Sequence, residues 1–255
     1  MTESLVIAPR FCGPPESGNG GYTCGRIAAY LDGPAQVTLR RPPPLATAMT
    51  IEHAGEGSVQ VLDGVALVAE GIRRPDDLAP ELPGPVSDPE ARAAGSRCRW
   101  LIYPEEHPFP ACFVCGPDRG PGDGLRIFPG RLAGRPLWAA PWTPDLSVTD
   151  ADGRVRPEVV WAALDCPSGI AAAEAAGLTQ DTAILLGRMT ASLAVLPVAG
   201  DQCQVIAWPG ERDGRKLMAG SVLLGPGGTV LASATAVWLT VPRLNRAADA
   251  WAADA

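Results

Sequence analysis

The 255-residue chain is 46% hydrophobic and only 19% charged, a composition that excludes a disordered protein. Its length allows one large domain or two small ones. A formal net charge of −7 argues against a general nucleic-acid-binding surface, which is usually basic and clustered.

No apolar run in the sequence reaches the roughly 18 to 20 residues that span a bilayer. The first residues, MTESLVIAPRF, lack the basic segment and long apolar stretch of a secretory signal. The 7 cysteines are therefore interpreted as reduced thiols, and an odd number cannot pair completely within one chain. We expect a cytoplasmic protein that binds neither nucleic acid nor membrane.

A helix is predicted over 20–31, where apolar residues recur at helical spacing before Asp32 and Gly33, a typical helix stop. The sequence Asp63-Gly64 is typical of a tight hairpin. The strands expected after the helix are 35–40, 48–53, 59–62 and 65–71.

Prolines, glycines and charges concentrate between residues 73 and 110, which indicates a linker. Within it, 91–103 has the pattern of a short helix or strand. The predicted units are an N-terminal half (1–85), a linker (86–110), a C-terminal half (111–245) and a tail (246–255).

The second half repeats this order, beginning with a helix over 157–176 that has proline in its first turn and Gly177 just past its end. Pro167 and Gly169 lie inside the helix and predict a break or kink after Cys166. The expected strands are 183–195, 203–208, 216–224 and 230–241. One helix followed by antiparallel strands, occurring twice, indicates duplication of an α+β unit.

Four segments carry a resemblance to a known superfamily: 17–21 (SGNGG), 112–116 (CFVCG) followed by 124–125 (GL), 161–165 (WAALD) and 37–45 (VTLRRPPPL). In hotdog-fold acyl-CoA thioesterases, 17–21 resembles the His-Gly-Gly entry to the central helix, and 112–116 with 124–125 resembles the lead-in strand and turn. The segment 161–165 resembles the helical segment that carries the catalytic carboxylate, and 37–45 resembles the strand after the helix. The resemblance implies an α+β double hotdog, with two antiparallel sheets that each wrap a central helix. The sheets are expected to join edge to edge, with both helices on one face.

Thioester hydrolysis needs donors for the oxyanion and a carboxylate that acts as base or nucleophile. Backbone N–H groups at a helix start lack intrahelical partners and lie at the positive end of the dipole. Gly20 and Gly21 are therefore the candidate donors, with the Asn19 amide as an orienting group. The alternative is a structural helix entry capped by Asn19.

The resemblance implies that the glycine turn and the carboxylate of one site come from different halves. When the family's spacing from His to Asp is counted forward from Asn19, the Asp position is occupied by Ala28, which cannot act as a base. When the same spacing is counted back from Asp165, the His-Gly-Gly position falls at 156–158, which contains no glycine and has a proline without an N–H. Each half thus retains a different component, and one composite site is expected. The alternative for Asp165 is a local carboxylate that accepts N–H bonds beside Pro167.

Substrate contacts are expected from the apolar helix residues Ile27, Trp161 and Leu164. Arg40 and Arg41 are candidates for the phosphates of coenzyme A or of a phosphopantetheine arm. The alternatives are core packing for the apolar residues and a solvated surface for the arginines.

The pair Cys112 and Cys115 has metal-ligand spacing, and Cys98 and His107 are the candidates to complete a ligand set. A structural zinc site normally has a second paired spacing, which this sequence lacks, so we expect buried thiols, no metal and no cofactor. His53 and His107 are predicted in a strand and in the linker, away from the helix entries, which disfavours a dehydratase.

The sequence therefore predicts a hydrolase of acyl thioesters, either of coenzyme A or of a carrier protein, with Asp165 as base or nucleophile. The alternative is a non-catalytic hotdog protein that binds an acyl thioester or another small ligand. A homo-oligomer through the remaining sheet edges is possible.

Overall fold

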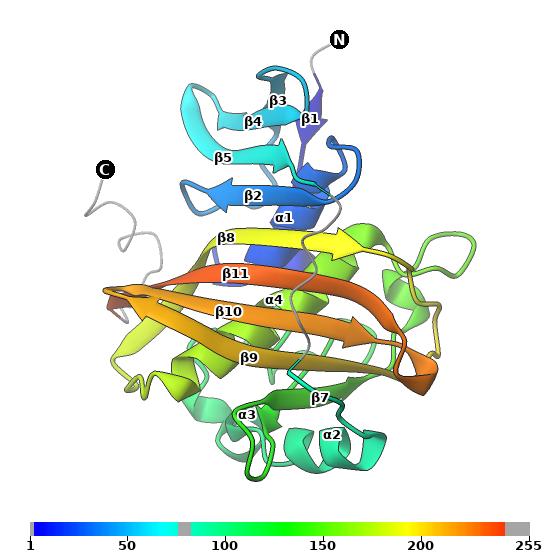
Figure 1. Ribbon diagram of the computed structural model, residues 1–255. Helices are drawn as coiled ribbons and strands as arrows, with labels where there is room; N and C mark the ends of the chain where they lie inside the picture. Colours follow the sequence, from blue (N-terminus) through cyan, green and yellow to red (C-terminus); the bar gives the residue numbers. More distant parts are fainter. Residues whose placement is uncertain (1–2, 76–82, 243–255) are drawn as a thin grey trace.

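The computed structural model describes residues 3–75 and 83–242, which form one long antiparallel sheet against two central helices (Figure 1). The strand order is β1-β3-β4-β5-β2-β8-β11-β10-β9-β7-β6. The strands are β1 Ser4–Leu5, β2 Ala35–Leu39, β3 Met49–His53, β4 Ser58–Asp63, β5 Ala66–Arg73, β6 Gly130–Arg131, β7 Trp138–Trp142, β8 Thr182–Leu193, β9 Cys203–Asp213, β10 Lys216–Leu224 and β11 Val230–Pro242.

The two central helices, α1 (Gly20–Ala28) and α4 (Pro157–Ala175), contact each other and lie on the same side of the sheet (Figure 1). The helix α1 contacts β2, β5 and β8, and α4 contacts β7 to β11. The remaining helical segments are α2 Asp88–Gly95, α3 Arg99–Ile102, and the 3-10 turns η1 Pro9–Phe11, η2 Pro104–Glu106, η3 Leu146–Val148 and η4 Pro226–Gly228. The helix α2 packs against β7, next to the far edge of the sheet.

The two halves join through β2 and β8, which pair antiparallel with Ala35 opposite Ala191. Counted outward from this seam, the first half has the order β2-β5-β4-β3 and the second has β8-β11-β10-β9. In both halves the first strand after the helix is followed in space by the fourth, third and second. This shared order supports the predicted duplication, and the edge-to-edge arrangement with both helices on one face is confirmed.

Glycines on α1 allow the central helices to approach closely. A Cβ atom on Gly21 would overlap the Cβ of Asp165, and one on Gly25 would lie 2.5 Å from the Cα of Glu158. Real side chains do not tolerate such contacts, so α4 can lie against this face of α1 only where glycine is present. The close approach carries residues of α4 to the beginning of α1.

The break expected after Cys166 is wrong, because α4 continues through Pro167 as one helix. Proline normally removes a helical hydrogen bond and crowds the preceding turn. Here hydroxyl groups supply neighbouring carbonyls with donors: Ser168 Oγ donates to the Asp165 carbonyl at 2.8 Å, and Ser221 Oγ to the Leu164 carbonyl at 2.8 Å. The N–H that proline lacks would have bonded the Ala163 carbonyl, so these bonds do not replace it, and the helix continues through Pro167 within the buried core.

Most other elements agree with their predicted positions, and 91–103 is helical in two pieces. The edge strands β1 and β6, and β7 next to β6, were not predicted. The predicted domain boundaries stay a prediction, and the tail 246–255 lies outside the described residues. The segment after 110 also contacts the first half, since the Phe113 N–H donates to the Cys12 carbonyl at 2.8 Å.

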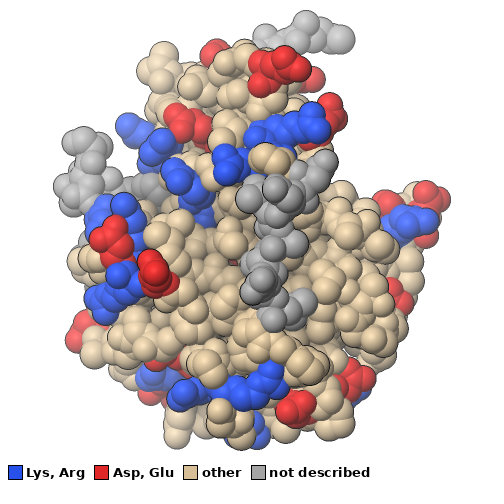
Figure 2. Space-filling view, in the orientation of Figure 1, with Lys and Arg blue, Asp and Glu red and all other residues tan. Residues whose placement is uncertain are grey.

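The sheet surface over β8 to β11 is mostly uncharged, and acidic and basic side chains gather along its margins (Figure 2). Among the described helices, none has both the length and the hydropathy that a membrane span requires.

Candidate active site

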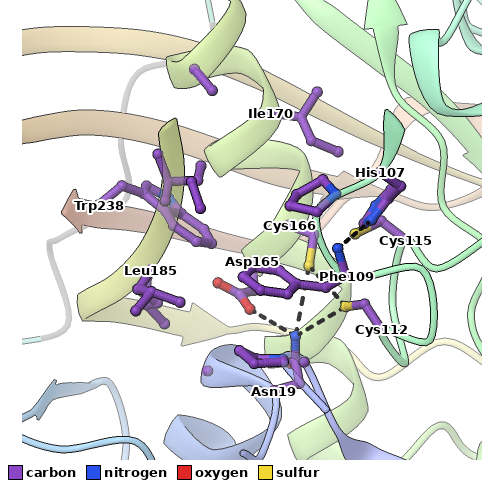
Figure 3. Close-up of a pocket in the computed structure, with 18 of the residues that line it drawn as sticks. Asn19, His107, Phe109, Cys112, Cys115, Asp165, Cys166, Ile170, Leu185 and Trp238 are labelled. Carbon is purple, nitrogen blue, oxygen red and sulfur yellow. Dashed lines mark hydrogen bonds between the residues drawn. The ribbon is translucent and has the colours of Figure 1, made fainter. Parts of the chain in front are cut away.

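A cavity of about 400 Å³ lies where the beginning of α1 meets the middle of α4 and the strand β8 (Figure 3). Asn19 and Gly20 line it from the first half of the chain, and Asp165 from the second. The structure therefore brings the predicted helix entry and the predicted carboxylate into one cavity.

Asn19 joins the two helices through both ends of its amide. Its Oδ1 accepts the Tyr22 N–H at 2.9 Å, which caps α1, and its Nδ2 donates to Asp165 Oδ2 at 3.1 Å. The side chain is 2% exposed, so water does not compete for these bonds. Asn19 thus serves as the predicted structural cap and also orients the carboxylate.

Asp165 is 1% exposed and is held through one of its two oxygens. Oδ2 accepts the Gly21 N–H at 2.9 Å in addition to the Asn19 amide. Oδ1 has no hydrogen-bond partner among the described residues. Figure 3 shows this oxygen directed away from Asn19, on the side of Leu185 and Trp238. One oxygen is therefore fixed by the protein, and the other is buried without a partner among the described residues.

Burial raises the pKa of Asp165 to about 7, because the charged form loses its solvation. The hydrogen bonds from Gly21 and Asn19 act in the opposite direction, whereas the neighbouring Cys112 adds to the rise. Perturbed carboxylates of this kind concentrate at functional sites.

The two glycine N–H groups have different tasks. The Gly21 N–H is occupied by Asp165 Oδ2, so it positions the carboxylate. The Gly20 N–H has no acceptor among the described residues, and Gly20 lines the cavity. As the first residue of α1, Gly20 offers an unpaired donor at the positive end of the helix dipole.

The residues expected to contact substrate are not among those that line this cavity. Ile27, Trp161 and Leu164 are at most 3% exposed and belong to the main core, not to the cavity lining. Arg40 and Arg41 are exposed, and Arg40 forms an ion pair with Glu70 at 2.8 Å.

The apolar lining of the cavity comes from residues that sequence reasoning did not single out. It consists of Phe109, Ile170, Leu178, Leu185, Leu186 and Trp238 among others. His107 also lines it, although it was placed in the linker. Leu185 and Leu186 are consecutive on β8, so alternation would place them on opposite faces of the sheet. Nothing in the sequence places both leucines or the linker residues here.

Asn19 allows its two tasks to be separated by mutation. Asn19→Asp should retain the cap to Tyr22 but replace the donor to Asp165 by a second carboxylate, whereas Asn19→Ala removes both. We expect Asn19→Ala to lower the free energy of unfolding by about 1–2 kcal/mol. We expect Asn19→Asp to impair activity. Its free energy of unfolding should rise as the pH falls, because protonation removes the repulsion between the new carboxylate and that of Asp165. Chemical denaturation at several pH values measures both; equal behaviour of the two variants would contradict the assignment.

No family model and no curated protein matches this sequence. Solved structures do match along nearly the whole chain. The tesB protein of Mycobacterium avium subspecies paratuberculosis superposes with a TM-score of 0.60 at 13% identity, over 94% of this chain and 92% of that one. A candidate thioesterase II from Thermobifida fusca gives 0.58 at 13% identity, over 93% and 91%. A candidate thioesterase from Novosphingobium aromaticivorans gives 0.57 at 12% identity, over 92% and 94%.

These similarities establish the fold. The chain has the double hotdog architecture of its structural neighbours, as its sequence predicted.

Proposed function

We propose that this double hotdog protein hydrolyses an acyl thioester in the cavity between α1 and α4. The observation that carries the proposal is that Asp165, whose Oδ1 is unpaired, and Gly20, whose N–H is unpaired, line the same cavity in the described structure. A base and an oxyanion donor are the two groups that the reaction needs. The similarity in fold to two proteins described as thioesterases supports the same reaction class.

In the proposed reaction the thioester carbonyl accepts the Gly20 N–H, and Asp165 Oδ1 takes a proton from an attacking water. The oxygen of that water bonds to the carbonyl carbon, and the electron pair of the C=O bond moves to the oxyanion beside Gly20. Collapse of the tetrahedral intermediate breaks the C–S bond and releases the thiolate, which takes up the proton. The products are a carboxylic acid and a thiol.

Direct attack by Asp165 on the carbonyl is the other route to the same products. It would give an anhydride between Asp165 and the acyl group. A single turnover in ¹⁸O-water distinguishes the two routes, because only the anhydride route leaves label on Asp165 or carries its oxygen into the acid.

The alternative is a protein that binds acyl thioesters without turning them over. A carboxylate turned away from Gly20, or fully engaged in local hydrogen bonds, would favour it. Asp165 lies in the cavity with Gly20, and only one of its oxygens is engaged. The arrangement favours the hydrolase.

The test is an assay of the purified protein against a panel of acyl-CoA and acyl-pantetheine thioesters of increasing chain length, with thiol release as the readout. We expect hydrolysis of at least one class above the buffer rate. Saturable binding without hydrolysis of any member would support the binding protein instead.

The apolar part of the cavity is the proposed acyl site, with Leu185 beside Asp165 (Figure 3). Leu185→Trp should fill this space and reduce kcat/KM for long acyl chains by about 10-fold or more, since a misfitting methylene costs about 1–3 kcal/mol. Short acyl chains should be much less affected. The control is Leu146→Trp at a position that is 74% exposed. An equal loss for every chain length would argue against an acyl site here.

Arg40 and Arg41 lie between Leu39 and Pro42, both of which line the cavity. We propose that they meet the phosphates of the thiol-bearing group outside it. Arg40→Ala with Arg41→Ala should raise KM for acyl-CoA several-fold and flatten its salt dependence, while KM for acyl-pantetheine, which has no nucleotide, stays the same. A KM for acyl-CoA that is insensitive to both salt and mutation would remove these arginines from the site.

A further inference from the structure

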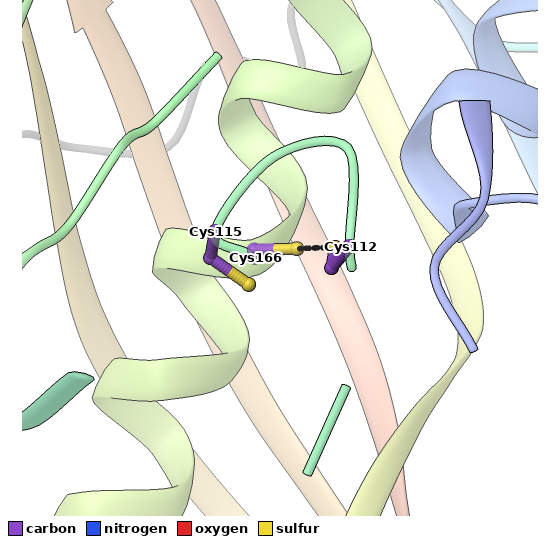
Figure 4. Close-up of side chains that lie close together, drawn as sticks. All are labelled: Cys112, Cys115 and Cys166. Carbon is purple, nitrogen blue, oxygen red and sulfur yellow. Dashed lines mark hydrogen bonds between the residues drawn. The ribbon is translucent and has the colours of Figure 1, made fainter. Parts of the chain in front are cut away.

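Three cysteine sulfurs gather at the side of the cavity opposite Leu185 (Figures 3 and 4). The Sγ atoms of Cys112, Cys115 and Cys166 all lie within 4.8 Å of one another, and those of Cys112 and Cys166 are 3.7 Å apart. All three are free thiols, and all three line the cavity. Thioester hydrolysis as proposed above does not use them.

Two of the sulfurs come from a tight turn. The Gly116 N–H closes it by donating to the Cys112 carbonyl at 2.9 Å. A Cβ atom on Gly116 would lie 2.6 Å from the Cys112 nitrogen, so this turn requires glycine there. The backbone thus holds the Cys-x-x-Cys pair with both sulfurs directed toward α4 (Figure 4).

The third sulfur is supplied by the tertiary structure. Cys166 follows Asp165 on α4, and the Asn19 amide that orients Asp165 also lies 3.6 Å from the Cys166 sulfur and 3.9 Å from the Cys112 sulfur. The sequence shows one Cys-x-x-Cys pair without a second paired spacing, which is why it predicts no metal site. The continuous helix through Pro167 adds the missing ligand.

The spacing suits a thiophilic cation. Sulfurs bound tetrahedrally to zinc at about 2.3 Å lie about 3.8 Å from one another. The Cys112 to Cys166 separation of 3.7 Å already has this value, and Cys115 needs only a small adjustment.

We propose that Cys112, Cys115 and Cys166 form a three-thiolate site for Zn²⁺ or a cation of similar softness, with a fourth coordination position that opens to the cavity. Binding forms three metal–sulfur bonds and releases to solvent the protons that the thiols carry. Water or a ligand in the cavity completes the tetrahedron, as in zinc sites with an open position. The assignment goes beyond the proposed hydrolysis and does not depend on it.

The experiment measures metal content and coordination in the intact, reduced protein. Protein purified with Zn²⁺ and a non-chelating reductant should retain about one zinc ion per chain by mass spectrometry. Replacing zinc by Co²⁺ should give a sulfur-to-cobalt charge-transfer band and the intense visible bands of a tetrahedral site. Cys112→Ser and Cys166→Ser should lose the zinc and the band. Cys203→Ser is the matched control, since Cys203 is also buried, at 2% exposure, and should keep both.

A measurement on the unmutated protein tests the site even if the cysteine variants fail to fold. With Zn²⁺ present, Cys112, Cys115 and Cys166 should be alkylated more slowly than without it, while alkylation of Cys203 should not change. Three results would each overturn the site. They are a zinc content of the parent protein no higher than that of Cys112→Ser, a missing charge-transfer band in the cobalt form, and equal alkylation rates of the three cysteines with and without zinc. Thioester hydrolysis is measured in the same preparations, so loss of the metal site and failure of the proposed hydrolysis give separate results.

Discussion

Replacing Asp165 by asparagine should abolish thioester hydrolysis and leave the protein at least as stable as before. The amide oxygen can still accept the N–H bonds from Gly21 and Asn19, which lie at 2.9 and 3.1 Å from Oδ2. The NH₂ group then takes the place of the unpaired Oδ1 and cannot accept a proton. We expect kcat to fall by about 10²–10⁴-fold, the usual contribution of a positioned base.

The stability of this variant is informative because the native carboxylate is costly to bury. Asp165 is 1% exposed, and one of its oxygens lacks a partner in the described structure, so the charged form is stabilised by Oδ2 alone. A neutral amide of the same shape avoids that cost. Chemical denaturation should therefore show an unchanged or higher free energy of unfolding, while thiol release falls to the buffer rate.

A second carboxylate on the same helix provides the control. Glu158 lies in the first turn of α4, pairs with Arg156 at 3.7 Å and does not line the cavity. Glu158→Gln should keep its activity within about twofold, because it changes charge without touching the site. An Asp165→Asn variant as active as the parent would reject Asp165 as the catalytic group, and a variant that unfolds would reject the described hydrogen bonding.

Gly21→Ala should strongly destabilise the protein, against the ordinary preference of helices for alanine. In an exposed helix interior this change would add up to about 1 kcal/mol to the free energy of unfolding. Here the added Cβ overlaps the Cβ of Asp165 and lies 2.8 Å from the Trp161 carbonyl oxygen. Separating α1 from α4 costs about 1–3 kcal/mol or more and moves the Gly21 N–H away from Asp165, so activity should be lost too.

The sign of this effect tests the close helix contact, since alanine stabilises any α1 that is not in contact with α4. Gly120→Ala is the control: a Cβ there meets no atom within 4 Å, and its backbone is not left-handed. We expect little change from it. Thermal and chemical denaturation of the two variants provide the comparison, and a stabilised Gly21→Ala would contradict the helix packing.

The local elements were predictable because their signals span only a few residues. Asn19 caps the first turn of α1, and Pro157 occupies the first turn of α4. Asp63 and Gly64 mark the hairpin between β4 and β5, where Gly64 has a φ of 59°. In each case a cap, a fixed φ or a left-handed turn acts on adjacent residues, so no distant contact is needed to specify it.

The candidate site was predictable in part. The resemblance of 17–21 and 161–165 to hotdog thioesterases placed Asn19, Gly20 and Gly21 opposite Asp165, and the structure brings these residues together. Their catalytic roles stay predictions. The resemblance did not show that the Gly21 N–H is occupied by the carboxylate, which leaves Gly20 as the free donor.

The sequence by itself determined the two helices, most of the strands and the order in which they recur, because these follow from periodicity and from turn chemistry. Only the tertiary structure decided that α4 continues through Pro167, that His107 and Phe109 line the cavity, and that Cys166 joins the Cys-x-x-Cys pair. These outcomes depend on atoms far apart in the chain: Cys112 and Cys166, for example, are separated by 54 positions. The packing of α4 on α1 and the pairing of β2 with β8 determine such contacts. No pattern within a short stretch of residues encodes them.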